Sequence, residues 1–310
     1  MEALFAAWHE FARGKRKRED VMAWERHLED NIFQLHAELR DGEYAHDPYA
    51  PFRVYDPKER QIHKATVKDR VVHQAIYTAI EPLFEKRFIY DSYSCRKNKG
   101  THAASRRLQK FCRRASKNNT RTVYALQLDI RRFFDSVDHK ILLELLESQV
   151  ANGQMMDLLE QIVGSFAMAP GKGLPLGNLT SQLFANVYLH GLDYFVKHGL
   201  KEQWYLRYCD DFIILTASHA KAIEHIRILQ KFLNSRLKLS IHPEKIRVKT
   251  WNQGIDFVGY VHMPHCAVVR TKTARRMFKL ANDTNLSSYL GLCGHANAYE
   301  LERTLLNKIG

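Results

Sequence analysis

The chain has 310 residues, of which 45% are hydrophobic and 11% aromatic, and a formal net charge of +13. This length and composition indicate a globular protein of one large domain or two lobes and exclude a disordered chain. No apolar run of about 18 residues is present, so we expect no membrane partner, and the N-terminus shows no signal-peptide pattern. The five cysteines form no Cys-x-x-Cys pair, which argues against zinc and disulfides and favours a cytoplasmic location.

The N-terminal part of the chain carries a helical pattern. Apolar residues recur at helical spacing through residues 1–45, which predicts amphipathic helices there. The aromatic members of the pattern, such as Trp8, Phe11 and Trp24, are therefore predicted to lie in the core and not to stack on nucleic acid. Pro48 and Pro51 end this pattern.

A long basic stretch follows. Between Asp91 and Asp129 the chain has ten Lys or Arg residues and no acid, namely Arg96, Lys97, Lys99, Arg106, Arg107, Lys110, Arg113, Arg114, Lys117 and Arg121. A solvated helix face normally mixes charges, so this stretch predicts a polyanionic partner. A second basic cluster comprises Arg270, Lys272, Arg275, Arg276 and Lys279.

Two acidic sites lie at the ends of predicted strands. Residues 124–130 alternate as a half-buried strand that ends at Asp129, and Asp138 is a plausible N-cap for a helix over residues 141–146. Further along, Asp210 and Asp211 lie at the predicted tight turn of a hairpin over residues 204–215. One interpretation is ordinary turn and capping chemistry. If the strands share one sheet, the three carboxylates instead converge on two metal ions about 4 Å apart.

Between the acidic sites lies a glycine- and proline-containing loop, residues 173–178, which leads into an amphipathic helix. Glycine lets backbone approach a ligand closely, so this loop is a candidate binding element. Residues 128–139, 173–189 and 207–215, in this order, resemble the palm of a reverse transcriptase. The resemblance extends over nearly the whole chain and includes residues 60–62, 69–75, 92–104, 242–245 and 254–260.

The resemblance implies an α+β right-hand polymerase with fingers, palm and a short helical thumb. We expect N-terminal helices and fingers over residues 1–122, the palm with the primer grip over 123–261, and the thumb over 262–310. The implied activity is RNA-directed DNA synthesis from deoxynucleoside triphosphates on an RNA template, extending a primer into cDNA.

The resemblance also assigns roles to residues. Asp129 and Asp210 would hold two Mg²⁺ ions, with the Ile130 carbonyl as a further ligand and Asp211 supporting the site. Further residues would bind the substrate or nucleic acid. Phe134 would exclude a 2′-hydroxyl, and Arg60, with Lys58, would hold the triphosphate. Lys245 would donate a proton to pyrophosphate, and Leu176 and Gln182 would line the base-pair pocket. The residues that would contact nucleic acid are Arg96, Lys97, Arg106, Arg107 and Arg113.

Within the family, the sequence is most similar to reverse transcriptases of diversity-generating retroelements. The similarity rests on residues 175–177 with Ser181 and Gln182, on residues 69–73, and on residues 288–291 with 295–297. Intron-encoded relatives usually carry Gln at the position of Leu176 and Pro at that of Gln182. Because polar contacts reject wrong ligands better than apolar ones, Leu176 predicts error-prone copying, which this lineage concentrates at template adenines. The resemblance also implies a small basic accessory protein as a partner.

Two alternatives stay open. One is a retron-type or phage-defence reverse transcriptase of ordinary fidelity. The other is a non-catalytic RNA-binding protein that retains the palm, against which the intact Asp129, Asp210 and Asp211 argue.

Overall fold

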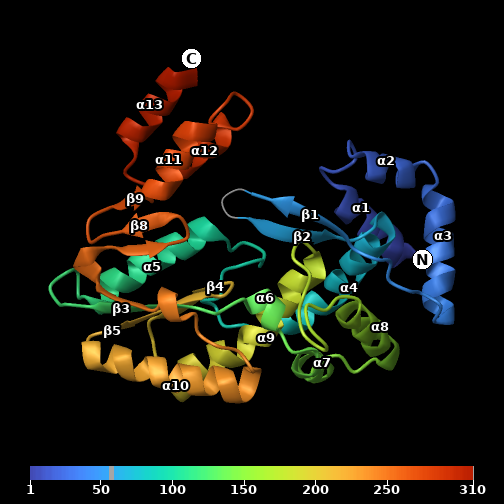
Figure 1. Cartoon of the computed structure of the whole chain (residues 1–310), viewed down its shortest axis with the longest axis horizontal. Coiled ribbons are helices and arrows are strands. Elements are labelled where there is room, and N and C mark those ends of the chain that lie inside the picture. Colours follow the sequence, from blue (N-terminus) through green and yellow to red (C-terminus); the bar gives the residue numbers. More distant parts are fainter. Residues whose placement is uncertain (56–58, 310) are drawn as a thin grey trace. The chain divides into compact units, whose positions relative to one another are not determined.

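The computed structural model describes residues 1–55 and 59–309. The chain forms two compact units, each assembled from three separate stretches of sequence. The first unit comprises Met1–Ile89, Arg132–Leu192 and Asn234–Leu239, and the second comprises Tyr90–Arg131, Asp193–Leu233 and Ser240–Gly310. Figure 1 shows the elements of both units.

The first unit is mainly helical. Its elements are α1 (Glu2–Ala12), α2 (Glu19–Glu25), α3 (Leu28–Asp41), a two-stranded antiparallel hairpin of β1 (Ala50–Val54) and β2 (Arg60–Lys64), α4 (Val67–Glu85), α6 (Phe133–Ser136), α7 (His139–Glu147), α8 (Gly153–Gly164) and most of α9 (Leu179–Tyr194). The predicted N-terminal helices are confirmed, and Trp8, Phe11 and Ile32 are buried in the core, whereas Trp24 is half-buried and packs against Trp8. The predicted cap is also present, since the Asp138 carboxylate accepts a hydrogen bond from the Ile141 amide at 3.2 Å.

The second unit is built around a four-stranded antiparallel sheet with the order β4-β5-β3-β6, called here the central sheet. Its strands are β3 (Tyr124–Asp129), β4 (Tyr205–Tyr208), β5 (Asp211–Thr216) and β6 (Arg247–Thr250). The sequence pattern placed the first three of these strands correctly. Asp211, predicted at the turn, is the first residue of β5 and pairs with Tyr208 of β4.

Two helices cover opposite faces of the central sheet (Figure 1). On one face, α5 (Thr101–Ala115) packs Leu108 and Phe111 against Leu206, Ile213 and other sheet residues. On the other lies α10 (His219–Leu237), which begins after Ser218, whose hydroxyl accepts a hydrogen bond from the Lys221 amide at 3.3 Å. A π-helix (Phe195–Gly199) and two 3₁₀ turns (Pro243–Lys245 and Trp251–Gln253) connect these elements.

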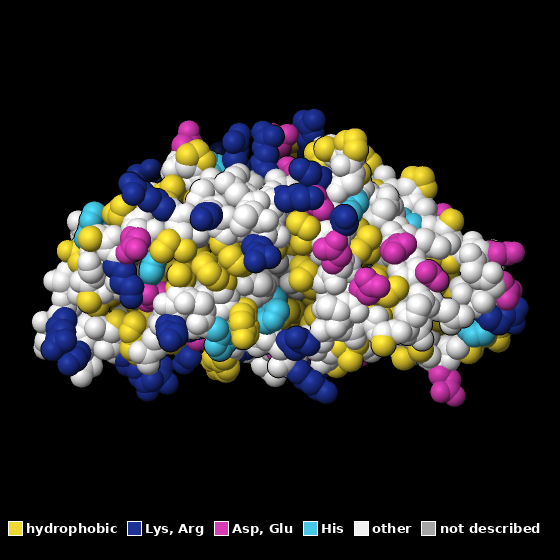
Figure 2. Space-filling model, turned by 90° about the horizontal axis from the view of Figure 1, so that it is seen from below, with side chains coloured by type: hydrophobic (Ala, Val, Ile, Leu, Met, Phe, Trp, Pro, Cys, Tyr) yellow, Lys and Arg dark blue, Asp and Glu magenta, His cyan; other side chains and the backbone are white. Residues whose placement is uncertain are grey.

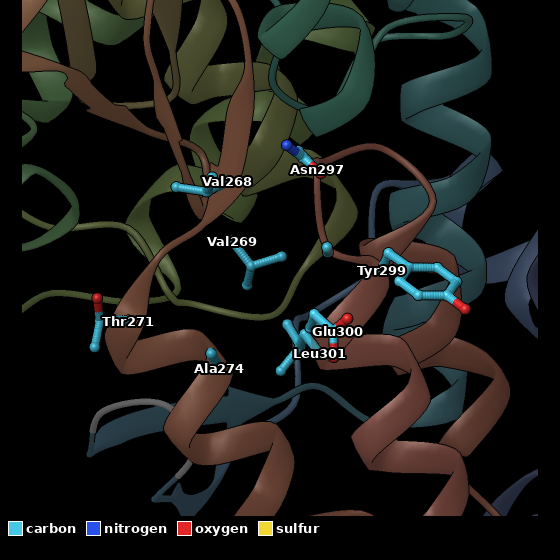
Figure 3. Close-up of a pocket in the computed structure, with 9 residues that line it drawn as sticks. Val268, Val269, Thr271, Ala274, Asn297, Tyr299, Glu300 and Leu301 are labelled. Atoms are coloured by element: carbon cyan, nitrogen blue, oxygen red, sulfur yellow. The ribbon is translucent and has the colours of Figure 1, made fainter.

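The C-terminal part of the second unit begins with a three-stranded antiparallel sheet of β7 (Ile255–Phe257), β8 (Tyr260–His262) and β9 (Ala267–Val269). Three helices follow, α11 (Thr271–Leu280), α12 (Leu286–Cys293) and α13 (Tyr299–Ile309), packed around Met277 and Leu305. A pocket of about 560 Å³ opens between β9, α11 and α13, and is lined mainly by apolar side chains such as Val269, Ala274 and Leu301 (Figure 3). No helix of the described residues is long and apolar enough to cross a membrane.

Candidate active site

The predicted convergence of distant carboxylates occurs in the second unit. β3 and β5 are paired so that Asp129 lies directly opposite Asp211. The Ile130 amide donates a hydrogen bond to the Asp210 carbonyl at 3.3 Å, which ties the end of β3 to the turn before β5. Antiparallel neighbours place their side chains within about 5.5 Å of each other. The central sheet therefore brings Asp129, Asp210 and Asp211 together at one end of its inner strands β3 and β5. This end of the sheet is called here the carboxylate edge.

These carboxylates repel one another. The protein around Asp211, followed by the charges of Asp129 and Asp210, raises the pKa of the Asp211 carboxyl well above its usual range, although this residue stays open to solvent on one side. Burial, and then the charge of Asp129, also raises the pKa of Asp210. A site that collects negative charge in this way favours a bound cation.

Lys245 supplies one positive charge at this edge. It ends the 3₁₀ turn Pro243–Lys245, and its Nζ lies 2.6 Å from Oδ1 of Asp129. The same turn is fixed to the strand because the His242 amide donates to the Asp129 carbonyl at 2.8 Å. The structure thus places Lys245 beside the carboxylates, and its role as proton donor to pyrophosphate stays a prediction.

The carboxylates fit a hard divalent cation by their chemistry, because Mg²⁺ takes oxygen ligands. In residues 1–55 and 59–309, however, no group of three or more His, Cys, Asp or Glu side chains is arranged so that it could hold a metal ion. The positive charge that the structure places against Asp129 is the Lys245 ammonium.

Apart from Lys245, the predicted substrate-binding residues Arg60, Phe134, Leu176 and Gln182 lie in the first unit, where three chain segments are held together by hydrogen bonds to the backbone. The His63 amide of β2 donates to the Leu176 carbonyl at 3.1 Å, and the Asn178 side chain donates to the His63 carbonyl at 3.0 Å. Gly177 has a φ of +105°, and a Cβ there would lie 2.7 Å from the Ile62 side chain, so the loop needs glycine at this position.

A third segment joins this loop. The Leu174 amide donates to the Phe134 carbonyl at 2.7 Å, which places α6 beside residues 174–178. Phe133 is buried (2% exposed) and is the core residue of the pair, whereas Phe134 is only half-buried and contacts Phe133 edge to face. Phe134, unlike Phe133, is therefore not a core residue.

The remaining predicted substrate-binding residues of the first unit differ in exposure. Leu176 is half-buried, Gln182 is exposed on α9, and Arg60 is exposed at the start of β2. Lys58 lies outside the described residues. β2, the loop and α9 thus carry Arg60, Leu176 and Gln182 on connected segments.

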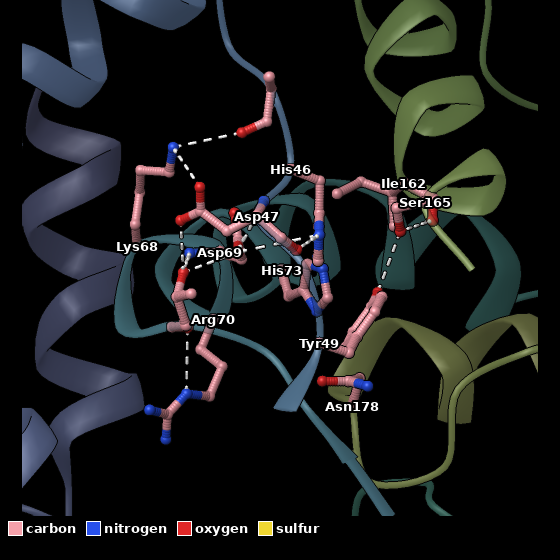
Figure 4. Close-up of polar contacts among 12 residues, drawn as sticks. His46, Asp47, Tyr49, Lys68, Asp69, Arg70, His73, Ile162, Ser165 and Asn178 are labelled. Carbon is pink, nitrogen blue, oxygen red and sulfur yellow. Dashed lines mark hydrogen bonds and ion pairs between the residues drawn. The ribbon is translucent and has the colours of Figure 1, made fainter. Parts of the chain in front are cut away.

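A buried polar network that the sequence analysis missed supports these segments (Figure 4). Asp69, fully buried at the start of α4, accepts hydrogen bonds from the Tyr44 hydroxyl at 2.8 Å and the Thr66 hydroxyl at 2.7 Å. One turn further along α4, the His73 ring lies 3.4 Å from the Thr180 hydroxyl at the start of α9. Burial lowers the pKa of His73 to about 3, so it is neutral at physiological pH. The network ties α4 to the helix that carries Gln182.

The basic stretch forms α5 and its flanks. Arg106, Lys110 and Arg113 are exposed at helical spacing on one side of α5, opposite the face that packs on the central sheet. Arg107 instead bonds to Asp91 through Nε at 2.7 Å and packs over Phe111. Lys97 is exposed, and Arg96 donates to the Ser92 carbonyl at 2.8 Å. On the face shown in Figure 2, Lys and Arg side chains are spread over the surface.

Reversing Arg106 and Arg113 to Glu should weaken RNA binding and flatten its salt dependence, by about 0.7 in the log–log slope for each phosphate that is no longer neutralised. The measurement is RNA binding across a salt series. Arg227→Glu with Lys231→Glu, an equal charge change on exposed positions of α10, is the matched control. Arg107 is left intact because it bonds to the buried Asp91, so that its reversal would also disturb the core. Equal slopes for the wild type and the α5 variant would show that this surface of α5 does not bind RNA.

Comparison with solved structures identifies the fold. The solved structures of telomerase from Candida tropicalis and from Candida albicans, the latter in complex with a fragment of telomeric RNA, are similar in fold. Their TM-scores are 0.52 and 0.55, at 11% identity, over 78% and 81% of this chain and 59% and 51% of those chains. The predicted right-hand polymerase fold is confirmed.

Sequence comparison gives the family. The model of the family "Reverse transcriptase (RNA-dependent DNA polymerase)" matches residues 56–262, more than half of the chain. The chain therefore belongs to the reverse transcriptase family, whose members are RNA-directed DNA polymerases.

Two curated relatives indicate which kind of reverse transcriptase domain the chain has. Protein YkfC of Escherichia coli is 26% identical over 73% of this chain and 69% of its own length. The group II intron-encoded protein LtrA of Lactococcus lactis is 22% identical over 83% of this chain. The chain spans 53% of LtrA, and so about half the length of this relative. The reverse transcriptase domain is thus of the group II intron-like kind.

Proposed function

We propose that this chain copies an RNA template into cDNA by two-metal nucleotidyl transfer. The observation that carries the proposal is the pairing of Asp129 opposite Asp211, which gathers three carboxylates at one edge of the central sheet. Asp129 and Asp210, with the Ile130 carbonyl, would hold two Mg²⁺ ions, and Asp211 would support them. Bound there, the ions would make the primer 3′-hydroxyl more acidic and neutralise the departing pyrophosphate.

The residues of this chain supply the rest of the chemistry. Lys245, whose ammonium lies beside Asp129, would give a proton to the departing pyrophosphate. In the first unit, the exposed guanidinium of Arg60 would hold the triphosphate, since its fork of donors matches phosphate oxygens. Phe134 would lie under the sugar, and Leu176 with Gln182 would line the new base pair.

We further propose that the copying is error-prone and serves a diversity-generating retroelement in the cytoplasm, with a small basic accessory protein as partner. The half-buried Leu176 supports this, because an apolar side chain cannot report a misplaced base through a missing hydrogen bond. Mismatches would then be rejected by shape alone, which is worth about 1–3 kcal/mol.

Leu176→Gln should lower the error rate while elongation continues, and the wild-type errors should concentrate opposite template adenine. The experiment extends a primer on a defined RNA with Mg²⁺ and sequences the cDNA from both proteins. Leu174→Met, a conservative change at a buried neighbour in the same loop, is the control and should leave the error spectrum unchanged. Uniformly low wild-type error without adenine bias would instead indicate a retron-type or defence enzyme. Absence of extension would favour a non-catalytic RNA-binding protein.

A further inference from the structure

A fully buried arginine lies next to the carboxylate edge. Arg207 is on β4, three residues before Asp210, and is 0% exposed. A buried guanidinium is unfavourable unless a carboxylate and further acceptors surround it. Its partners therefore indicate what the arginine holds in place.

One side of the guanidinium is locked to an acid. Nε and Nη2 of Arg207 donate to the two carboxylate oxygens of Asp193 at 2.7 and 2.6 Å, and Asp193 is also 0% exposed. Such a two-point contact fixes the plane of the guanidinium. Nη2 also donates to the Ser92 hydroxyl at 3.2 Å, and the Tyr205 hydroxyl donates to Asp193 at 2.6 Å.

The other side of the guanidinium reaches the turn that carries Asp210. Nη1 of Arg207 donates to the Cys209 carbonyl at 2.9 Å. Cys209 and Asp210 form the two-residue turn between the paired residues Tyr208 and Asp211. The Cys209 carbonyl is part of the peptide group that leads to Asp210, so this hydrogen bond fixes the position of the Asp210 backbone.

The Cys209–Asp210 turn has a backbone conformation that needs support from its surroundings. Cys209 has a φ of 56°, in the left-handed region, at the first position of a tight hairpin turn where glycine is favoured. A residue with a Cβ keeps this conformation only where its surroundings hold it there. The hydrogen bond from Arg207 is such a constraint.

Backbone hydrogen bonds also fix β4, the strand that carries Arg207. The Arg207 amide donates to the Asp91 carbonyl, and the Arg207 carbonyl accepts from the Tyr93 amide, each at 2.9 Å. The backbone and the guanidinium of Arg207 are thus both held in place, and the bond to the Cys209 carbonyl connects this arrangement directly to the carboxylate edge.

We propose that Arg207, locked by Asp193, is a positioning residue that sets the Cys209–Asp210 turn and so aims the Asp210 carboxylate for nucleotidyl transfer. The role rests on the proposed polymerase function. Arg207 touches no reacting atom itself and acts through the Cys209 carbonyl.

The test uses the full chain and two variants. The double variant Arg207→Met with Asp193→Asn removes both charges, so no unpaired charge is left in the core. Arg207→Lys keeps the charge, but a single ammonium cannot bond Asp193 in two places and also reach Cys209. Tyr205→Phe is the matched control, because it removes one hydrogen bond to the same Asp193 and leaves the bond to Cys209 in place.

Two quantities are measured beside the melting temperature. One is the affinity of the protein alone for Mn²⁺, by electron paramagnetic resonance, and the other is the division of the extension defect between kcat and the KM for deoxynucleotide. Both Arg207 variants should lose about 10- to 100-fold in Mn²⁺ affinity and in kcat, with KM little changed, as for residues that orient metal ligands. Tyr205→Phe should keep wild-type values. A merely structural role would lower the melting temperature without this pattern.

The outcomes are distinct. A folded double variant with wild-type Mn²⁺ affinity and kcat would overturn the role of Arg207 and leave the polymerase function standing. Should the double variant not fold, the Lys variant decides by the same criterion. A wild-type chain that neither binds Mn²⁺ nor extends a primer would overturn the proposed function, and the positioning role with it.

Discussion

Primer extension should fall at least about a thousandfold when Asp210 or Asp129 is replaced by Asn, because charge stabilisation at a two-metal site is worth several kcal/mol. RNA binding should be unchanged, since neither residue belongs to the exposed basic surface of α5. The melting temperature should stay the same or rise after Asp210→Asn, because the change removes one of three carboxylates that repel one another. The measurements are single-turnover extension with Mg²⁺, an RNA-binding titration and a thermal melt.

The control for this experiment is Asp283→Asn, which neutralises an exposed carboxylate of the second unit away from the central sheet. It should extend primers like the wild type. Near wild-type extension by Asp210→Asn or Asp129→Asn would show that these residues hold no catalytic metal. Loss of extension together with a lower melting temperature would point to misfolding instead.

The second large effect concerns the selection of deoxynucleotides over ribonucleotides. Phe134→Ala should lower the preference for deoxynucleotides over ribonucleotides by about 10- to 200-fold, the usual worth of one steric contact in a pocket. The half-buried position of Phe134 on α6 makes this substitution tolerable for the fold. The measurement compares kcat/KM for a deoxynucleotide and the matching ribonucleotide in the wild type and the variant.

The neighbouring phenylalanine provides the control. Phe133 is 2% exposed, so Phe133→Leu should lower the stability by about 1–3 kcal/mol and leave sugar discrimination unchanged. If Phe134→Ala discriminates like the wild type, Phe134 is not the steric gate, and the selection against ribonucleotides lies elsewhere in the chain.

Local patterns in the sequence predicted much of the candidate site. Alternating apolar residues located β3, and the apolar runs on both sides of the two-acid turn located β4 and β5. The acids at the ends of these strands met because β3 pairs antiparallel with β5. The Asp138 cap also follows from a short-range rule, since it needs only the first turn of its own helix. What remained a prediction is the role of each residue, since a role depends on a bound partner.

The buried polar contacts could not be predicted in this way. Arg207 and Asp193 carry no local pattern that pairs them, and Asp69 appeared only as part of a family-like motif, although it is fully buried and bonded to Tyr44. Such pairs form because the fold brings distant segments together and an unpaired buried charge would be too costly. Arg107 illustrates the same limit, because composition cannot distinguish an arginine bonded to Asp91 from one that is free to bind RNA.

The interleaved order of the second unit has a consequence for the way the chain is made. During synthesis, α5 leaves the ribosome with Leu108 and Phe111 exposed, while β4 and β5, which cover them, follow about a hundred residues later. Trp251 and Ile255, which complete the same core, emerge later still. The nascent chain must therefore hold the apolar face of α5 without β4 and β5 for about a third of its elongation. Slow refolding and dependence on chaperones are the expected signature of so many long-range contacts.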